Sequence, residues 1–335
     1  MYTAKNSLNE KFSSLDYFRG FAGYGVAICH YYYYIYNLKH FEYLSFFFVE
    51  FFFILSGYVL TPQIIKVYNQ NKNLKIFFLR RWMRTIPLFI LAVILYSILF
   101  KRFDLDTLKY FFLIQNFFPN FLEKEYISIL WSLSIEEYFY LTFPILIILL
   151  SKIDINKLVK YFIITFLILN ILGGFYLDST DLRINTFLRL DSIVYGICLR
   201  LYFSFFNKKI NLFILLLIIT YFFFTYSRNF IEADFNKLEK ILFIFNLKLL
   251  SIYFCLFFIS LEKYFKRLKS FGVLIANQTY SVYLFHLMFI YFFDNYFSTS
   301  QYNIIYYFLS IFIFSTIVYN LFEKPINTLR PKFLK

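Results

Sequence analysis

Long apolar runs recur along almost the whole of this 335-residue chain, and they decide what it can fold into. Hydrophobic residues make up 60% of the chain and charged residues only 16%, whereas soluble domains contain about 45–50% apolar and about 25% charged residues. A single soluble core cannot bury this much apolar surface. Lipid is therefore the expected solvent, which excludes the soluble globular and the disordered classes.

Ten segments have the length and composition of membrane-crossing helices. A helix needs about 20 mostly apolar residues to cross a bilayer, and backbone groups in lipid must be hydrogen-bonded within their own segment, which favours helices. The predicted fold is an all-α, polytopic integral membrane bundle of about ten transmembrane helices, forming one domain over residues 1–335. The predicted spans are 20–36, 45–62, 85–100, 131–150, 158–175, 187–206, 210–226, 241–260, 271–293 and 303–322.

Basic residues are distributed unevenly between the two sides of such a bundle. With the N-terminus placed inside, 22 of the 34 Lys and Arg residues fall in inner segments, and 11 fall in outer loops or outer helix ends. Cytoplasmic loops of membrane proteins carry this kind of excess. The distribution predicts that both termini are cytoplasmic, and it accounts for the net charge of +14 without a nucleic-acid partner.

Cysteine spacing gives no sign of a metal site. Cys29, Cys198 and Cys255 all lie inside apolar runs, and none of them belongs to a CxxC motif. Neither a disulfide framework nor a zinc site is therefore indicated, and no metal ion is expected in the functional site.

Charge is costly at or within the predicted spans, so an ionisable residue there is a functional candidate by default, and eight such residues form the short list. Arg19 and His30 are eleven residues apart, which places them on one face of a helix and about 16 Å apart along its axis. Arg19 is expected at the cytoplasmic edge, where it also suits a simple anchoring role, and His30 near mid-membrane. The eight residues are Arg19, His30, Glu50, Glu136, Glu137, Arg189, Asp191 and His286.

Depth within the spans groups most of these residues in the outer half of the membrane. Histidine with carboxylate partners suits general base chemistry near neutral pH, so His30 is expected to meet Glu50, Glu136, Asp191 and His286 there. The alternative is that the carboxylates pair with Arg189 and hold the bundle together. Arg189 and Asp191 are two residues apart and do not face each other on a helix, so each is expected to pair across helices.

Three arginines close the inner loop after the second span. Arg81 and Arg84 are i, i+3 neighbours, so both can hold one anion, and arginine matches phosphate geometry bidentately. Together with Arg80 they are candidates for binding the phosphate groups of a cofactor or co-substrate. The alternative is that all three simply anchor the loop at the cytoplasmic surface.

Several short motifs, in order along nearly the whole chain, resemble those of the membrane acyltransferase-3 family of bacterial O-acyltransferases. The first, SLDYFRGFA at 14–22, leads on to His30 and gives an Arg-x10-His pair. Tyr17 and Tyr138 depart from the residues usual in the family, which are Gly and Gln. The other motifs are VEFFFILSGY at 49–58, FLRRWMRTIP at 78–87, WSLSIEEYFY at 131–140, and weaker matches at Arg189-x-Asp191, at 280–286 and at Glu323-x-Pro325.

The resemblance implies transfer of an acyl group, usually acetyl, from cytoplasmic acyl-CoA to a hydroxyl of a cell-surface or exported glycan. It implies a multi-pass protein of the bacterial inner membrane, with acyl-CoA as co-substrate, no bound cofactor and the glycan or glycolipid as acceptor. It also implies that Arg19 and His30 are essential and that Arg81 and Arg84 serve the donor. No motif matches the extracytoplasmic hydrolase-like domain that some members carry.

The predicted mechanism assigns a role to each candidate. His30 either deprotonates the acceptor hydroxyl or carries the acyl group, and Arg19 guides the donor or stabilises oxyanion charge. Glu136 and Glu137 are expected to orient His30 or the acceptor. Arg80, Arg81 and Arg84 are expected to bind the donor, and Glu50, Arg189, Asp191 and His286 to face the acceptor.

Two functions from other classes remain open from the sequence. A transporter or flippase of lipid-linked sugar also carries charges at the midplane, often on broken helices in inverted repeats. No such repeat is evident here. A structural partner in a polysaccharide synthesis complex is the second alternative, with the motif residues only holding the bundle. Ser56 is a possible nucleophile, although Ser before Gly57 more often marks close helix packing.

Overall fold

The computed structural model describes residues 12–333 apart from 72, 119, 204–214, 216–217, 224–235 and 297–302, and its regular elements in this part of the chain are helices. They include seven shorter elements: α5 (Leu105–Phe111), α8 (Ser179–Ile184), α9 (Leu190–Leu201), α13 (Glu262–Phe265), η1 (Lys266–Leu268), η2 (Tyr319–Glu323) and α16 (Lys324–Thr328). The long helices are α2 (Ser14–Tyr36), α3 (Lys39–Asn69), α4 (Asn73–Leu99), α6 (Leu130–Leu149), α7 (Ile155–Tyr176), α12 (Lys237–Ser260), α14 (Lys269–Tyr296) and α15 (Asn303–Val318).

Seven helical stretches in the described part of the chain are long and apolar enough to cross a membrane. They contain α3, α4, α6, α7, α12, α14 and α15, and they correspond to seven of the ten predicted spans. The protein is thus an all-helical, multi-pass membrane protein. Of the other three predicted spans, 20–36 falls in α2, 187–206 contains α9 and ends in residues outside the described part, and 210–226 lies largely outside it.

The first helix begins six residues earlier than its predicted span, at Ser14. The backbone N–H groups of Ser13 and Ser14 donate to the carboxylate of Glu262, at 3.0 and 2.8 Å. The first N–H groups of a helix have no partner within the helix, and an anion near them is favourable. This contact with α13 extends α2 beyond its apolar run, so Arg19 lies within the helix and not before it.

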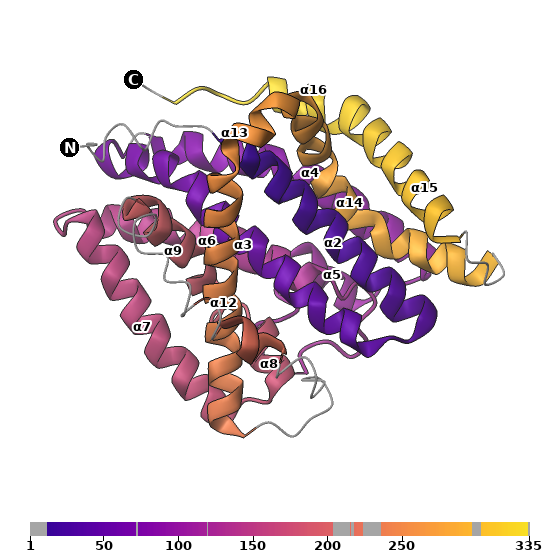
Figure 1. Ribbon diagram of the computed structural model, residues 1–335, viewed down its shortest axis with the longest axis horizontal. Coiled ribbons are helices and arrows are strands. Elements are labelled where there is room, and N and C mark those ends of the chain that lie inside the picture. The colour runs from indigo at the N-terminus through magenta and orange to yellow at the C-terminus, as the bar shows by residue number, and fades with distance from the viewer. Residues whose placement is uncertain are drawn as a thin grey trace.

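Helices α2, α3 and α14 form the centre of the bundle, with α15 packed outside α14 and α7 at the opposite edge (Figure 1). The closest approach joins α3 to α9. A Cβ atom on Gly57 would lie 1.9 Å from the carbonyl oxygen of Ile193, and one on Gly196 would lie 2.1 Å from that of Ile54. Two glycines therefore permit backbone contact at this crossing.

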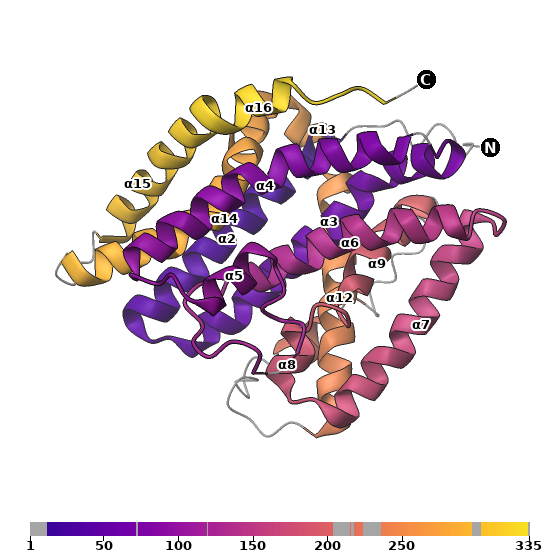
Figure 2. The same ribbon diagram turned by 180° about the vertical axis from the view of Figure 1, so that it is seen from behind.

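Both ends of the described chain lie at the same end of the bundle (Figures 1 and 2). The C-terminal segment is held there by Arg80, whose guanidinium donates to the carbonyl of Pro331 at 2.5 Å and lies 5.2 Å from the centre of the Phe333 ring. At the opposite end lie the turn from α2 to α3, the helices α5 and α8, and the start of α12. The bundle thus has a terminal end and a far end.

Candidate active site

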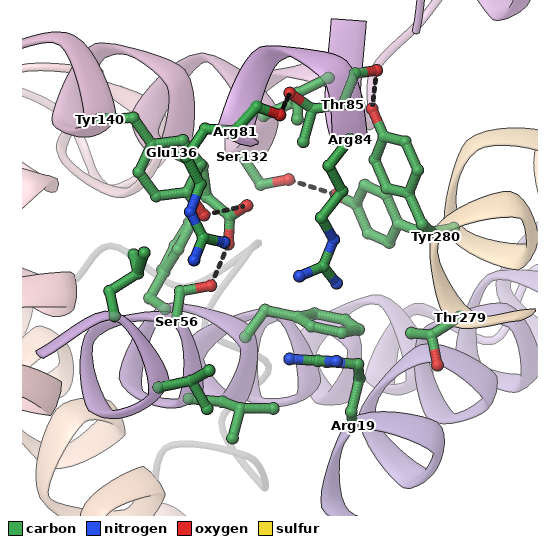
Figure 3. Close-up of a pocket in the computed structure, with 17 residues that line it drawn as sticks. Arg19, Ser56, Arg81, Arg84, Thr85, Ser132, Glu136, Tyr140, Thr279 and Tyr280 are labelled. Carbon is green, nitrogen blue, oxygen red and sulfur yellow. Dashed lines mark hydrogen bonds between the residues drawn. The ribbon is translucent and has the colours of Figure 1, made fainter. Parts of the chain in front are cut away.

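A cavity of about 790 Å³ toward the terminal end of the bundle gathers three arginines, and we call it the arginine cavity. Arg19 comes from α2, whereas Arg81 and Arg84 come from α4, one turn apart. Figure 3 shows their guanidinium groups directed toward the same space. Three cations around one cavity suit an anionic ligand such as a phosphate group.

One carboxylate of α6 faces these arginines. Glu136 accepts hydrogen bonds from the hydroxyls of Ser56, at 2.7 Å, and Tyr140, at 3.1 Å, and all three residues line the cavity (Figure 3). The guanidinium carbon of Arg81 lies 5.6 Å from the centre of the Tyr140 ring. Glu137 is buried but is not among the lining residues. The structure thus places Glu136 beside the arginines and shows no contact between it and His30.

His30 lies in a second cavity of about 710 Å³, toward the far end, which we call the histidine cavity. Its Nδ1 lies 2.7 Å from Nε2 of His286 on α14, and the two rings are stacked with centres 5.0 Å apart. Glu42, Ser45 and Arg183 line the same cavity. The sequence predicted that His30 meets the outer carboxylates and His286, and of these residues the structure places His286 against it.

The hydrogen bonds of this pair fix where the protons are when both rings are neutral. Nδ1 of His286 lies 2.7 Å from the carbonyl oxygen of Tyr283, which can only accept, so His286 carries its proton on Nδ1. Its Nε2 must then accept from Nδ1 of His30. The Nε2 atom of His30 is left as a base, which can accept from the Ser45 hydroxyl at 3.1 Å. The same hydroxyl lies 2.6 Å from the carbonyl oxygen of Glu42, so its one proton has two acceptors.

Tyr283 separates the two cavities, because its side chain lines both of them. Its hydroxyl donates to the carbonyl of Ile129 at 2.9 Å and lies 2.5 Å from the hydroxyl of Ser132, which lines the arginine cavity. The arginines and the histidine are therefore on opposite sides of one buried tyrosine.

The remaining predicted acceptor residues form ion pairs outside both cavities. Arg189 pairs with Glu50, and Asp191 pairs with Lys248 of α12; all four side chains are almost fully buried. Asn170 of α7 donates to Asp191 at 3.0 Å. The sequence left two alternatives for these residues, a place beside His30 or pairing between helices, and the structure shows pairing between helices. Their place in the bundle is explained by the need of each buried charge for a partner.

Arg80 is also separated from the site, because its contacts with Pro331 and Phe333 direct it away from the arginine cavity. Of the three predicted donor-binding arginines, the cavity therefore receives Arg81 and Arg84. Arg19, predicted either to guide the donor or to stabilise oxyanion charge, joins them. Arg19 and His30 lie on one face of α2, but at different heights along the helix, and each lines a different cavity.

Sequence reasoning did not single out Arg183, Ser45, Tyr283 or Lys248. Arg183 falls between predicted spans, yet it is directed into the histidine cavity and lies 3.6 Å from the centre of the Phe46 ring; burial lowers the pKa of Arg183 to about 10. Lys248 carried a usable signal, since a lysine inside an apolar run needs a buried partner. Tyr283 lies in the 280–286 motif, which gave it no role of its own, and Ser45 carried no signal.

No group of three or more His, Cys, Asp or Glu residues in the described part of the chain is arranged to hold a metal ion. The side chains that could hold a co-substrate are the three arginines of the arginine cavity, whose charge suits phosphates. Those that could move a proton are the two histidines. The arrangement can therefore bind an anion at one level of the bundle and perform base catalysis at another.

These features define a multi-pass helical membrane protein with a transferase-like site inside the bundle. Residues 12–322 match the family model described as an acyltransferase domain, and the chain belongs to this family, acyltransferase 3.

Curated relatives agree with the family match. The chain is 27% identical over 355 aligned residues to the O-acetyltransferase OatA of Staphylococcus aureus (strain NCTC 8325 / PS 47), covering 93% of this chain and 57% of the relative. A peptidoglycan O-acetyltransferase OatA of Listeria monocytogenes is 32% identical over 123 residues, covering 31% of this chain and 20% of that protein. The chain thus spans little more than half of the first relative. No solved structure matches it.

Proposed function

We propose that this protein is a membrane O-acyltransferase that moves an acyl group, most often acetyl, from cytoplasmic acyl-CoA to a hydroxyl of a cell-surface or exported glycan. The membership in the family and the names of the relatives support O-acetyl transfer to a glycan. We place the protein in the inner membrane with both termini in the cytoplasm. The reason is that most Lys and Arg residues fall in the segments on the same side as the termini.

The observation that carries this proposal is the meeting of the two cavities at Tyr283. A donor that carries phosphates at one end and a thioester at the other needs cations near the cytoplasm and a base deeper in the bundle. The arginine cavity and the histidine cavity supply these groups, about 16 Å apart along α2 if measured from Arg19 to His30. Tyr283 stands on the path between them.

In the donor step, Arg19, Arg81 and Arg84 hold the phosphates of acyl-CoA by charge-assisted hydrogen bonds. Glu136 positions this group of cations, because its carboxylate faces them and is itself fixed by Ser56 and Tyr140. The thioester then extends past Tyr283 toward His30.

In the transfer step, Nε2 of His30 takes the proton of the acceptor hydroxyl, and the hydroxyl oxygen attacks the thioester carbonyl carbon. The carbon–sulfur bond then breaks, and the proton held on Nε2 passes to the leaving thiolate of CoA. Arg183, the cation of the histidine cavity, is placed to stabilise the oxyanion that forms in between. His286 holds Nδ1–H of His30 and keeps Nε2 directed at the reaction.

The test is His30→Ala, assayed in membranes with labelled acetyl-CoA and the surface glycan as acceptor. Loss of the base is expected to lower the transfer rate by about 100-fold or more. His40→Ala is the matched control, because His40 is exposed at the start of α3 and its replacement is expected to leave transfer unchanged. Wild-type labelling of the glycan by the His30→Ala protein, at equal abundance, excludes the proposed role.

A further inference from the structure

In the histidine cavity, the guanidinium group of Arg183 lies against two aromatic side chains, which we call the aromatic clamp. Its central carbon atom lies 3.6 Å from the centre of the Phe46 ring and 5.3 Å from the ring centre of Trp131. Arg183 belongs to α8, Phe46 to α3 and Trp131 to α6, and all three side chains line the cavity. Three elements far apart in the sequence therefore meet at one cation.

This arginine has no partner of opposite charge, although two carboxylates line the same cavity. Within the described part of the chain, neither Glu42 nor Glu125 forms an ion pair with Arg183, and its guanidinium group makes no hydrogen bond. A cation is attracted to the negative face of an aromatic ring, and a guanidinium group stacked on a ring uses none of its five N–H donors for that contact. The clamp therefore holds the charge and leaves the donors free.

The free donors of Arg183 open into the histidine cavity. Arg189 shows the contrast, because it is 1% exposed and its Nε and Nη1 atoms are sealed within the bundle. Arg183 is partly exposed, and none of its nitrogen atoms is sealed in this way. The two carboxylates disfavour a permanently charged anion in this space. An anion that exists only during the reaction, the oxyanion on the acyl carbon, is the ligand that these donors suit.

We propose that Phe46 and Trp131 are positioning residues for the transfer step, which keep the donors of Arg183 directed at the oxyanion. This role rests on the proposed function, because it concerns the cation that stabilises the oxyanion of that reaction. Without the clamp, Arg183 is expected to turn to Glu42 or Glu125 and pair with it. Donors that are already in place cost no reorganisation during the reaction, whereas a paired arginine must first leave its carboxylate. Loss of a ring is therefore expected to lower kcat and to leave donor binding unchanged.

The experiment is a double-mutant cycle between Phe46 and Arg183, measured in membranes with labelled acetyl-CoA and the surface glycan that these membranes carry. Arg183→Met removes the cation and is expected to lower kcat by about 100-fold or more. Phe46→Leu is expected to lower kcat by about 10- to 100-fold, as a misplacement of about 1 Å can do, with the KM for acetyl-CoA unchanged. Once Arg183 is absent, Phe46→Leu is expected to have little further effect, because it acts through that arginine.

Three further variants separate positioning from packing. Phe46→Tyr keeps the ring face and is expected to retain most of the kcat. Phe47→Leu is the matched control, because Phe47 is 7% exposed, against 6% for Phe46, and lines neither the arginine cavity nor the histidine cavity. It is expected to leave kcat unchanged. Trp131→Leu removes the other ring and replaces Phe46→Leu in the cycle if that protein does not accumulate.

Tryptophan fluorescence tests the clamp without donor or acceptor. The chain has two tryptophans, so in a Trp82→Phe protein the emission comes from Trp131 alone. Arg183→Met takes the cation away from the indole ring and is expected to shift this emission. Phe46→Leu lets the cation move, so it is expected to shift the emission when Arg183 is present and not in the Arg183→Met protein.

The two readouts distinguish failure of the clamp from failure of the proposed function. The expected emission shifts, together with no acetyl transfer by the wild-type protein, support the clamp and contradict the proposed function. Acetyl transfer with the same loss of kcat from Phe46→Leu in both backgrounds, or with no loss in either, overturns the positioning role alone. An emission shift of equal size with and without Arg183 overturns the clamp itself.

Discussion

At the scale of single residues, the proton arrangement of His30 depends on His286. A side chain at position 286 must accept from Nδ1 of His30 for Nε2 to remain a base. His286→Gln places an amide oxygen near the lost nitrogen and is expected to retain most activity. His286→Met cannot accept this bond and is expected to lower kcat by about 100-fold, the low end of what a general base contributes.

The measurement for His286 is kcat and the KM for acetyl-CoA across pH. A positioning role predicts a loss confined to kcat, a shifted pH profile in the Met protein, and rescue by Gln. Equal activity of the Met and Gln proteins contradicts the proton arrangement proposed for His30.

The donor arginines can be tested against a neighbour with the same charge. Arg81→Ala removes a cation from the arginine cavity and is expected to raise the KM for acetyl-CoA by about 10- to 100-fold, the value of a charge-assisted hydrogen bond. Arg80→Ala removes an equal charge whose contacts lie with Pro331 and Phe333, and it is expected to leave that KM unchanged. If both variants behave alike, the arginines serve only as a basic anchor.

The ion pair between Arg189 and Glu50 is a structural feature with a measurable energy. Arg189→Met leaves the Glu50 carboxylate buried and unpaired at the junction of α3 and α9, and it is expected to cost about 3–5 kcal/mol of stability. The double variant Glu50→Leu with Arg189→Met removes both charges and is expected to recover most of that loss. Thermal unfolding in detergent measures both, and a double variant no more stable than the single one contradicts this account.

At the scale of the helices, apolar run length predicted the seven membrane-spanning helices that the structure supports, because length in lipid is set by bilayer thickness. The same rule was less successful at the start of the span 187–206, because α9 begins only at Leu190. The preceding residues are held in a turn, since Leu188 N donates to the side chain of Asn185 at 3.1 Å. A turn can lie within a stretch of apolar composition, so the length of an apolar run does not reveal where the helix begins.

The sequence singled out residues that line the cavities but predicted only part of their grouping. Arg19, His30, Arg81, Arg84 and Glu136 do line cavities. Which of them share a cavity depends on helix neighbours, and His30 and His286 are 256 residues apart. Depth along one helix predicts height in the bundle but not the facing partner, so the sequence placed Glu136 with His30 and the structure places it with Ser56.

At the crossing of α3 and α9, adding a single carbon atom is expected to reduce the amount of folded protein strongly. A Cβ atom at position 57 would lie 1.9 Å from a backbone oxygen, which cannot move without displacing a helix. Gly57→Ala is therefore expected to lower folded abundance in membranes strongly. Gly173→Ala is the matched control, because its Cβ would meet only the methyl ends of Leu182 and Leu188, at 2.9 Å. Equal abundance of the two proteins contradicts a rigid contact at Gly57.

At the scale of the whole molecule, polar and apolar surfaces are divided between the interior and the edges. Arg189, Asp191 and Lys248 are buried near the centre. The outer helices α7 and α15 instead expose large apolar side chains, among them Ile164, Ile168, Ile313 and Ile317. In lipid such residues need no cover, so these helices are expected to face the bilayer while α2, α3 and α14 enclose the reaction path.

The direction of that path is a prediction about the whole bundle. Acyl-CoA is proposed to enter from the cytoplasm, so the terminal end must face inward and the loop around Lys124 outward. In intact cells, a charged maleimide that cannot cross the membrane is expected to label Lys124→Cys at once. It is expected to label Lys263→Cys only after the cells are made permeable, since both side chains are exposed but at opposite ends.

The unsubstituted protein provides the blank for this labelling, because Cys29 and Cys255 are buried and Cys198 is partly buried. The opposite labelling pattern places the arginine cavity on the outside, where acyl-CoA is absent, and it rules out the proposed donor route. The predicted labelling pattern places the arginine cavity on the cytoplasmic side, where acyl-CoA is present. The histidine cavity then faces the side from which an exported glycan must arrive.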